Sequence, residues 1–82
     1  MVTFKLEVGE SCEASMLDYN SPLVSVHLTL NGSERRFRLD LGKRIAIDRF
    51  EGEDVIVPPL LDMVSAFVRA KRIALLKGTP DP

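Results

Sequence analysis

The chain has very little of the chemistry from which most catalytic and metal sites are built. Its 82 residues include one cysteine, Cys12, and one histidine, His27, and no tryptophan. A single cysteine excludes an internal disulfide, and one cysteine with one histidine is too few for a zinc site. No calcium-loop spacing, phosphate-binding loop or nucleophile-elbow motif occurs either. We therefore expect no catalytic residues, no enzyme activity, no cofactor and no metal.

Neither Cys12 nor His27 stands in a pattern that suggests reactivity. Cys12 lies close to Glu10 and Glu13, and neighbouring negative charges raise the pKa of a thiol and make it a weaker nucleophile. His27 alternates onto the polar side of an expected strand. We interpret Cys12 as an unreactive loop or half-buried thiol, although the two residues can still approach each other in space.

Strong net charge and long apolar runs are also missing. Eleven basic residues face twelve acidic ones, so the formal net charge is −1 and gives no overall attraction to nucleic acid or to an anionic membrane. No uncharged apolar run is long enough to span a bilayer. The first ten residues lack the basic start and apolar core of a signal peptide. These features predict a cytoplasmic protein without a membrane segment.

What the chain does have is clear periodicity. Apolar residues recur at every second position in 2–8, 24–30 and 37–41, which is typical of half-buried strands. The dipeptide Asn31-Gly32 suits a tight turn, so residues 23–41 are predicted to form a β-hairpin. Residues 45–47 continue the alternation as a fourth strand that can reach Phe50.

The last third of the chain predicts a helix. Pro59 is suited to a first helical turn, and Gly78 to the position that follows a helix end. Residues 55–57 form either a fifth strand or an extended lead into this helix. The order of elements predicts one α+β domain over residues 1–78. In it, a C-terminal helix packs on the apolar face of an antiparallel sheet of four or five strands, and 79–82 form a short flexible tail.

The predicted helix is apolar over most of its circumference. Its core face is expected to consist of Leu60, Val64, Phe67, Val68 and Leu75. Lys71 falls inside this face, so we expect it to extend along the sheet edge to water or to meet a carboxylate of Glu7, Asp18 or residues 51–54. Ile73 and Leu76 lie beside a polar stripe that includes Arg69 and Arg72, where one sheet should leave them exposed.

Two further features bear on function. Residues 9–22 are predicted as a long loop that either covers the core or binds a partner, with Met16, Leu17 and Tyr19 as its apolar material. An edge strand or a short helical turn within it is a further alternative. Residues 34–49 carry six basic and three acidic side chains, and Arg36 and Arg38 are expected on the polar face of the sheet.

Together these patterns predict a non-enzymatic protein–protein interaction domain of the adaptor, regulatory or inhibitor type, which can self-associate through its C-terminal helix. The alternative is a nucleic-acid-associated protein that uses an arginine-bearing sheet face. No small-molecule substrate is evident. The predicted partner-binding residues are Arg69, Arg72, Ile73, Leu76, Arg36 and Arg38.

Overall fold

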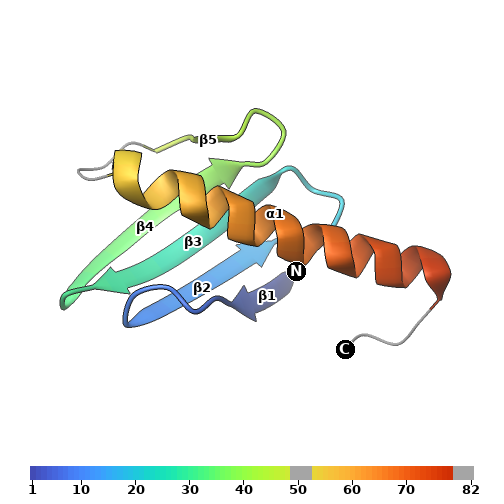
Figure 1. Cartoon of the computed structure of the whole chain (residues 1–82), viewed down its shortest axis with the longest axis horizontal. Helices are drawn as coiled ribbons and strands as arrows, with labels where there is room; N and C mark the ends of the chain where they lie inside the picture. The colour runs from blue at the N-terminus through green and yellow to red at the C-terminus, as the bar shows by residue number, and fades with distance from the viewer. Residues whose placement is uncertain (49–52, 79–82) are drawn as a thin grey trace.

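The computed structural model describes residues 1–48 and 53–78, and it confirms the predicted α+β class. Five antiparallel strands follow one another across a single sheet in chain order, and one helix lies across one face of that sheet (Figure 1). The elements are β1 (Val2–Lys5), β2 (Ser11–Met16), β3 (Leu23–Leu30), β4 (Ser33–Asp40), β5 (Ile45–Ala46) and α1 (Glu53–Lys77). The predicted tail over residues 79–82 lies outside the described residues.

The predicted hairpin is confirmed as β3 and β4. Their register ends with Leu30 opposite Ser33, so Asn31 and Gly32 form a two-residue turn. Both turn residues have positive φ angles, 51° and 78°, as a tight hairpin turn that matches the twist of the strands requires. The following strand is shorter than predicted. It covers only Ile45–Ala46, and Phe50 lies outside the described residues.

The prediction of a long loop over residues 9–22 is wrong. Its middle, Ser11–Met16, is strand β2, which lies inside the sheet and pairs with both β1 and β3. Cys12, Ala14 and Met16 alternate toward the core and are buried. A cysteine and an alanine are weak apolar signals, which is why the period of two was not evident in the sequence.

The predicted helix start at Pro59 is also wrong. The helix begins at Glu53, so residues 55–57 are helical and Pro58 and Pro59 lie inside α1. A proline removes the hydrogen bond to the carbonyl four residues earlier, and here those carbonyls belong to the first helical turn. The loss of helical hydrogen bonds is therefore confined to the first turn of the helix. Burial of Val57 against the sheet offsets part of its free-energy cost.

The core lies between the inner face of the sheet and the first sixteen residues of α1. The described residues place no polar or charged side chain in it. The sheet contributes Phe4, Cys12, Ala14, Met16, Val24, Val26, Leu28, Phe37 and Leu39, and the helix contributes Val57, Leu60, Leu61, Val64 and Val68.

The second half of α1 extends beyond the sheet. A helix of 25 residues is about 37 Å long, and its C-terminal turns project past the corner where β1 begins (Figure 1). Leu60, Val64 and Val68 are buried as predicted, and Phe67 is half-buried. Leu75, predicted to be in the core, is 62% exposed because no strand lies beneath it.

This contrast within one helix gives a first prediction. Leu60→Ala should lower the free energy of unfolding by about 2–5 kcal/mol, because it removes a fully packed side chain and leaves a cavity. Leu76→Ala should change it by no more than about 0.5 kcal/mol, because Leu76 is exposed. Urea denaturation of the two variants and the parent chain measures both values. Equal losses in the two variants would contradict the placement of the helix.

The turn between β1 and β2 depends on Gly9. Its φ of 61° is in the left-handed region, and an added Cβ would lie 2.6 Å from the Thr29 carbonyl oxygen. That oxygen also accepts a hydrogen bond from the Glu10 amide at 2.9 Å, which keeps it from moving aside. Gly32 has a similar φ of 78°, but nothing lies within 4 Å of its added Cβ.

The two glycines provide a matched pair of variants. Gly32→Ala should cost about 1–2 kcal/mol of folding free energy from backbone conformation alone. Gly9→Ala should cost more, because the steric clash with the Thr29 carbonyl adds to the same backbone term. Thermal and chemical unfolding of both variants checks the order, and a smaller loss for Gly9→Ala would refute this account of the turn.

Candidate interaction surface

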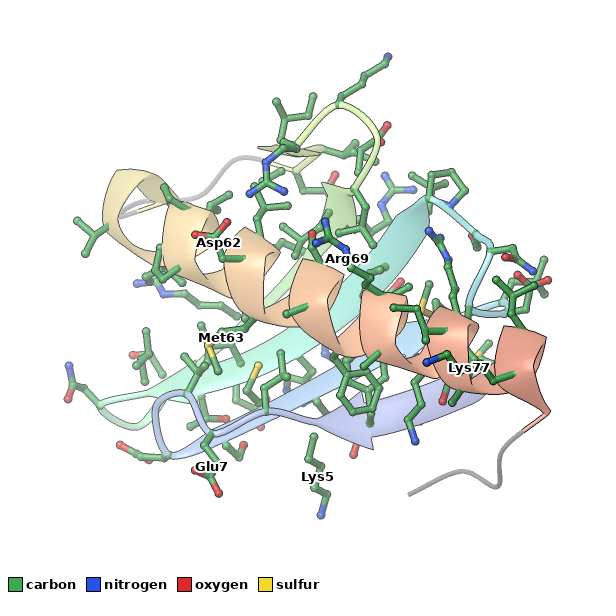
Figure 2. All side chains as sticks on the ribbon, turned by 45° about the vertical axis from the view of Figure 1, so that its right-hand side comes forward. Lys5, Glu7, Asp62, Met63, Arg69 and Lys77 are labelled. Atoms are coloured by element: carbon green, nitrogen blue, oxygen red, sulfur yellow. The ribbon has the colours of Figure 1, made fainter. Side chains whose placement is uncertain are left out.

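One exposed side of α1 gathers four of the predicted partner-binding residues. Arg69, Arg72, Ile73 and Leu76 are spaced three, one and three residues apart, which places them on one side of a helix. All four are exposed, Ile73 to 45% and Leu76 to 88%. We call these four residues the arginine face. Figure 2 shows Arg69 on the opposite side of α1 from Met63.

A groove of about 310 Å³ runs beside this face, between α1 and two loop segments of the sheet. Its positive charge comes from Arg69 and Arg72 on the helix and from Arg44 in the turn before β5. No acidic side chain of the described residues lines it. The remaining lining residues are Asn20, Pro22, Leu41, Gly42, Ser65 and Val68.

The three arginines of the groove are held differently. Arg44 has a φ of 56°, and its guanidinium pairs with Asp62 and donates to the Ser65 hydroxyl at 3.4 Å. The Arg72 Nε donates to the carbonyl of Tyr19, which leaves its outer nitrogens available. Within residues 1–48 and 53–78, the Arg69 side chain has no hydrogen bond or ion pair.

This arrangement leaves an excess of positive charge on the groove. Asp62, at its margin, is the carboxylate that partly neutralises it through Arg44. Guanidinium groups present several N–H donors in a plane and bind carboxylates in pairs of hydrogen bonds. The groove is therefore suited to an acidic ligand, and its attraction should weaken with salt because the arginines are solvent-exposed.

Lys71 forms a cluster with the aromatic residues Phe4, Tyr19 and Phe67. Phe67 stacks on Phe4 with ring centroids 4.2 Å apart, and Tyr19 lies 6.5 Å from Phe67. The Lys71 ammonium lies 5.3 Å from the centre of the Phe67 ring, and the side chain is half-buried. This position is in keeping with the expected path of Lys71 along the margin of the core. The proposed acids at positions 51–54 have no described side chains.

Arg36 and Arg38 lie on the opposite, open face of the sheet. The register places Arg36 across from His27 and Arg38 across from Ser25, as the alternation predicts. Arg38 binds Asp48 at 3.2 Å, and this hydrogen bond and charge raise the pKa of the guanidinium. The predicted partner-binding residues therefore form two separate surfaces on opposite sides of the molecule.

The open face has a shallow hollow of about 430 Å³ with mixed charge. Glu13 and Asp48 line it together with Arg36 and Arg38, and the small side chains of serines form part of its floor. Strand residues of the described chain place no phenylalanine or tyrosine on this face. Single-stranded nucleic acid is usually bound on a sheet through stacked aromatic side chains. Apart from His27, the described residues of this face therefore offer no ring on which bases usually stack.

Cys12 and His27 do not form a site together. Cys12 points into the core, whereas His27 points to the open face, where its Nε2 lies 3.7 Å from Glu34. The pKa of the Cys12 thiol is raised, as expected, but the cause is burial rather than the neighbouring glutamates. In the part of the chain that the structure describes, no cluster of metal-ligating side chains occurs.

Comparisons of the chain with family models, curated proteins and solved structures found no match. Over the described residues, α1 is too polar to cross a lipid bilayer. The candidate site must therefore be judged on its own geometry. Sequence reasoning identified Arg69 and Arg72 but missed Arg44, which reaches the groove from a turn, and the Tyr19 carbonyl, which accepts a hydrogen bond from Arg72. The basic Lys43-Arg44 pair after Gly42 was the one available signal.

Burial of Cys12 gives a prediction about reactivity and pH. A thiol reagent should modify the folded protein far more slowly than a Ser11→Cys/Cys12→Ala variant, in which the thiol is moved to an exposed neighbour. Because folding raises the thiol pKa, the folded state holds this proton more tightly than the unfolded state. The contribution of Cys12 to stability should be complete below about pH 8.5 and be lost as the pH rises above it.

The labelling rate and the pH dependence of unfolding measure these effects, with Cys12→Ala as the reference for the second. Equal labelling of the two thiols would show that β2 does not bury Cys12.

Proposed function

We propose that this chain is a non-enzymatic interaction domain that binds an acidic segment of a partner protein on the arginine face and the adjoining groove. The observation that carries the proposal is the groove of Arg44, Arg69 and Arg72, which no acidic side chain lines within the part of the chain that the structure describes. Ile73 and Leu76 lie next to it and are exposed, so charge and apolar surface occur together.

The chemistry of this surface defines its partner. Arginine is enriched in protein interfaces, where its planar group binds carboxylates and its stem packs against apolar atoms. Ile73 and Leu76 offer apolar area that a partner can remove from water. An acidic segment that also carries leucine-like side chains satisfies both needs, and an amphipathic helix presents them at a matching spacing.

The same charges make the arginine face a poor surface for binding itself. Two copies of this face in an antiparallel helix pair would bring Arg72 close to Arg72 of the second copy. Like charges at an interface oppose association, and none of the four residues of the face is acidic. Self-association of the chain is therefore expected at a different surface.

The nucleic-acid alternative has less support. Arg38 is engaged by Asp48, and acidic side chains lie beside both arginines of the open face. Stacking contacts with bases also rely on aromatic side chains, and the described strands place no phenylalanine or tyrosine on this face. We therefore keep nucleic acid as a competing outcome of the test below.

A titration followed by NMR tests the proposed function. The probe is a synthetic amphipathic peptide with glutamates and leucines at helical spacing, and the control peptide has glutamine in place of each glutamate. We expect amide shifts at residues 69–76 and in the turn around Arg44 with the first peptide, and weaker shifts as salt is added. Arg69→Glu should weaken binding by about tenfold or more, because it reverses a charge in the groove.

Arg36→Glu is the matched control, since it makes the same change on the open face and should leave peptide binding unaltered. Equal binding of the two peptides, or shifts confined to the open face, would refute the proposal. Stronger binding of a DNA or RNA oligonucleotide that is lost on Arg36→Glu would support the nucleic-acid alternative instead.

A further inference from the structure

The free edge of β1 presents backbone groups that no other described strand pairs. β1 lies at one end of the strand order, with β2 as its neighbour. Phe4 is opposite Ala14, and the Leu6 amide donates to the Cys12 carbonyl at 3.0 Å. Because antiparallel strands alternate the direction of their peptide groups, those of Val2, Phe4 and Leu6 face β2. The amides and carbonyls of Thr3 and Lys5 therefore point away from the sheet.

A mainly apolar side of α1, bordered by Lys71, lies above this edge. Phe67 stacks on Phe4 of β1, and Met63 and Ala70, four residues before and three after it, share its side of the helix. Met63 points toward the β1 side of the molecule in Figure 2. Met63 and Ala70 are exposed, and Phe67 is half-buried. We call these three residues the apolar flank.

The sequence of β1 is complementary to itself about Phe4. If two β1 strands pair in antiparallel orientation with Phe4 opposite Phe4 of the second copy, Thr3 lies opposite Lys5 and Lys5 opposite Thr3. The outward peptide groups of these residues then bond to each other, and the two lysines do not face one another. The two phenylalanines become neighbours on the inner face, each already stacked on a Phe67.

We propose that a second copy of this chain binds along β1 in this register, so that two five-stranded sheets join into one continuous sheet. The interface is isologous, with the same edge used by both copies about a two-fold axis. Both helices lie on the same face of the joined sheet, with their apolar flanks turned toward each other across the axis. The surface is separate from the arginine face, so this inference does not rest on the proposed function.

The shortness of β1 should keep this pairing weak and reversible. β1 has only four residues, and lysine on an edge strand usually discourages pairing. The Lys5 side chain, however, is exposed on the open face, where Glu13 is its cross-strand neighbour, and it does not cover the edge. We expect a dimer with a dissociation constant of roughly micromolar or weaker, at the small end of protein interfaces.

Sedimentation velocity over a wide concentration range tests the dimer. The parent chain should shift from monomer to dimer as concentration rises. Lys5→Pro should raise the dissociation constant by about tenfold or more, because it removes an outward amide that the monomer does not use. Lys5→Thr keeps that amide and is the matched control, which should dimerise at least as well as the parent chain. Circular dichroism checks that both variants keep the fold.

Amide hydrogen exchange measured by NMR is a second test of the dimer, and it needs no variant. Protection of the Thr3 and Lys5 amides should increase with protein concentration, while amides in the arginine face stay unchanged. A chain that remains monomeric at every concentration overturns the proposal, and so does a folded Lys5→Pro variant that dimerises normally. A dimer without added protection at Thr3 and Lys5 overturns it as well. Arg69→Glu should not affect dimerisation, so failure of either proposal leaves the other intact.

Discussion

The architecture depends on the packing of one helix against the whole apolar face of a five-stranded sheet. Five buried residues of α1 make this contact, and all of them lie in its first sixteen positions, from Val57 to Val68. Burial of apolar area on both layers supplies the main stabilisation, because the described core contains no ion pair or polar network. The helix cannot move along the sheet without exposing these side chains, so these sixteen positions fix where the rest of the helix lies.

This fixed position determines which surfaces are available for interaction. Once α1 is anchored up to Val68, its remaining turns extend past the corner of the sheet with no described strand beneath them. One side then forms a groove with the turn that carries Arg44, and the Arg44–Asp62 pair ties this turn to the helix. The other side lies above the edge of β1. A basic surface and a mainly apolar surface are thus separated by the width of one helix, which favours different partners on each.

Much of this fold could be predicted from the periodicity of the sequence. The hairpin of β3 and β4 was evident because valines and leucines alternate with polar residues on both sides of Asn31-Gly32. β2 was not evident, because Cys12 and Ala14 are small and their burial depends on strands on either side. The helix start was misplaced because the local preference of Pro58 and Pro59 was outweighed by the packing of Val57. Arg69 and Arg72 could be assigned to a helix surface, but the approach of Arg44 depends on a turn conformation that no local pattern specifies.

The described core contains no polar side chains, so the residues that stabilise the fold differ from those proposed for recognition. Every charged residue that lines the groove or the open face lies at the surface, where substitution usually has little effect on folding. The signs and positions of these charges can therefore change between related chains while the same layers persist. A fold of this kind can acquire a new binding preference through a few surface substitutions, without first gaining stability to compensate for them.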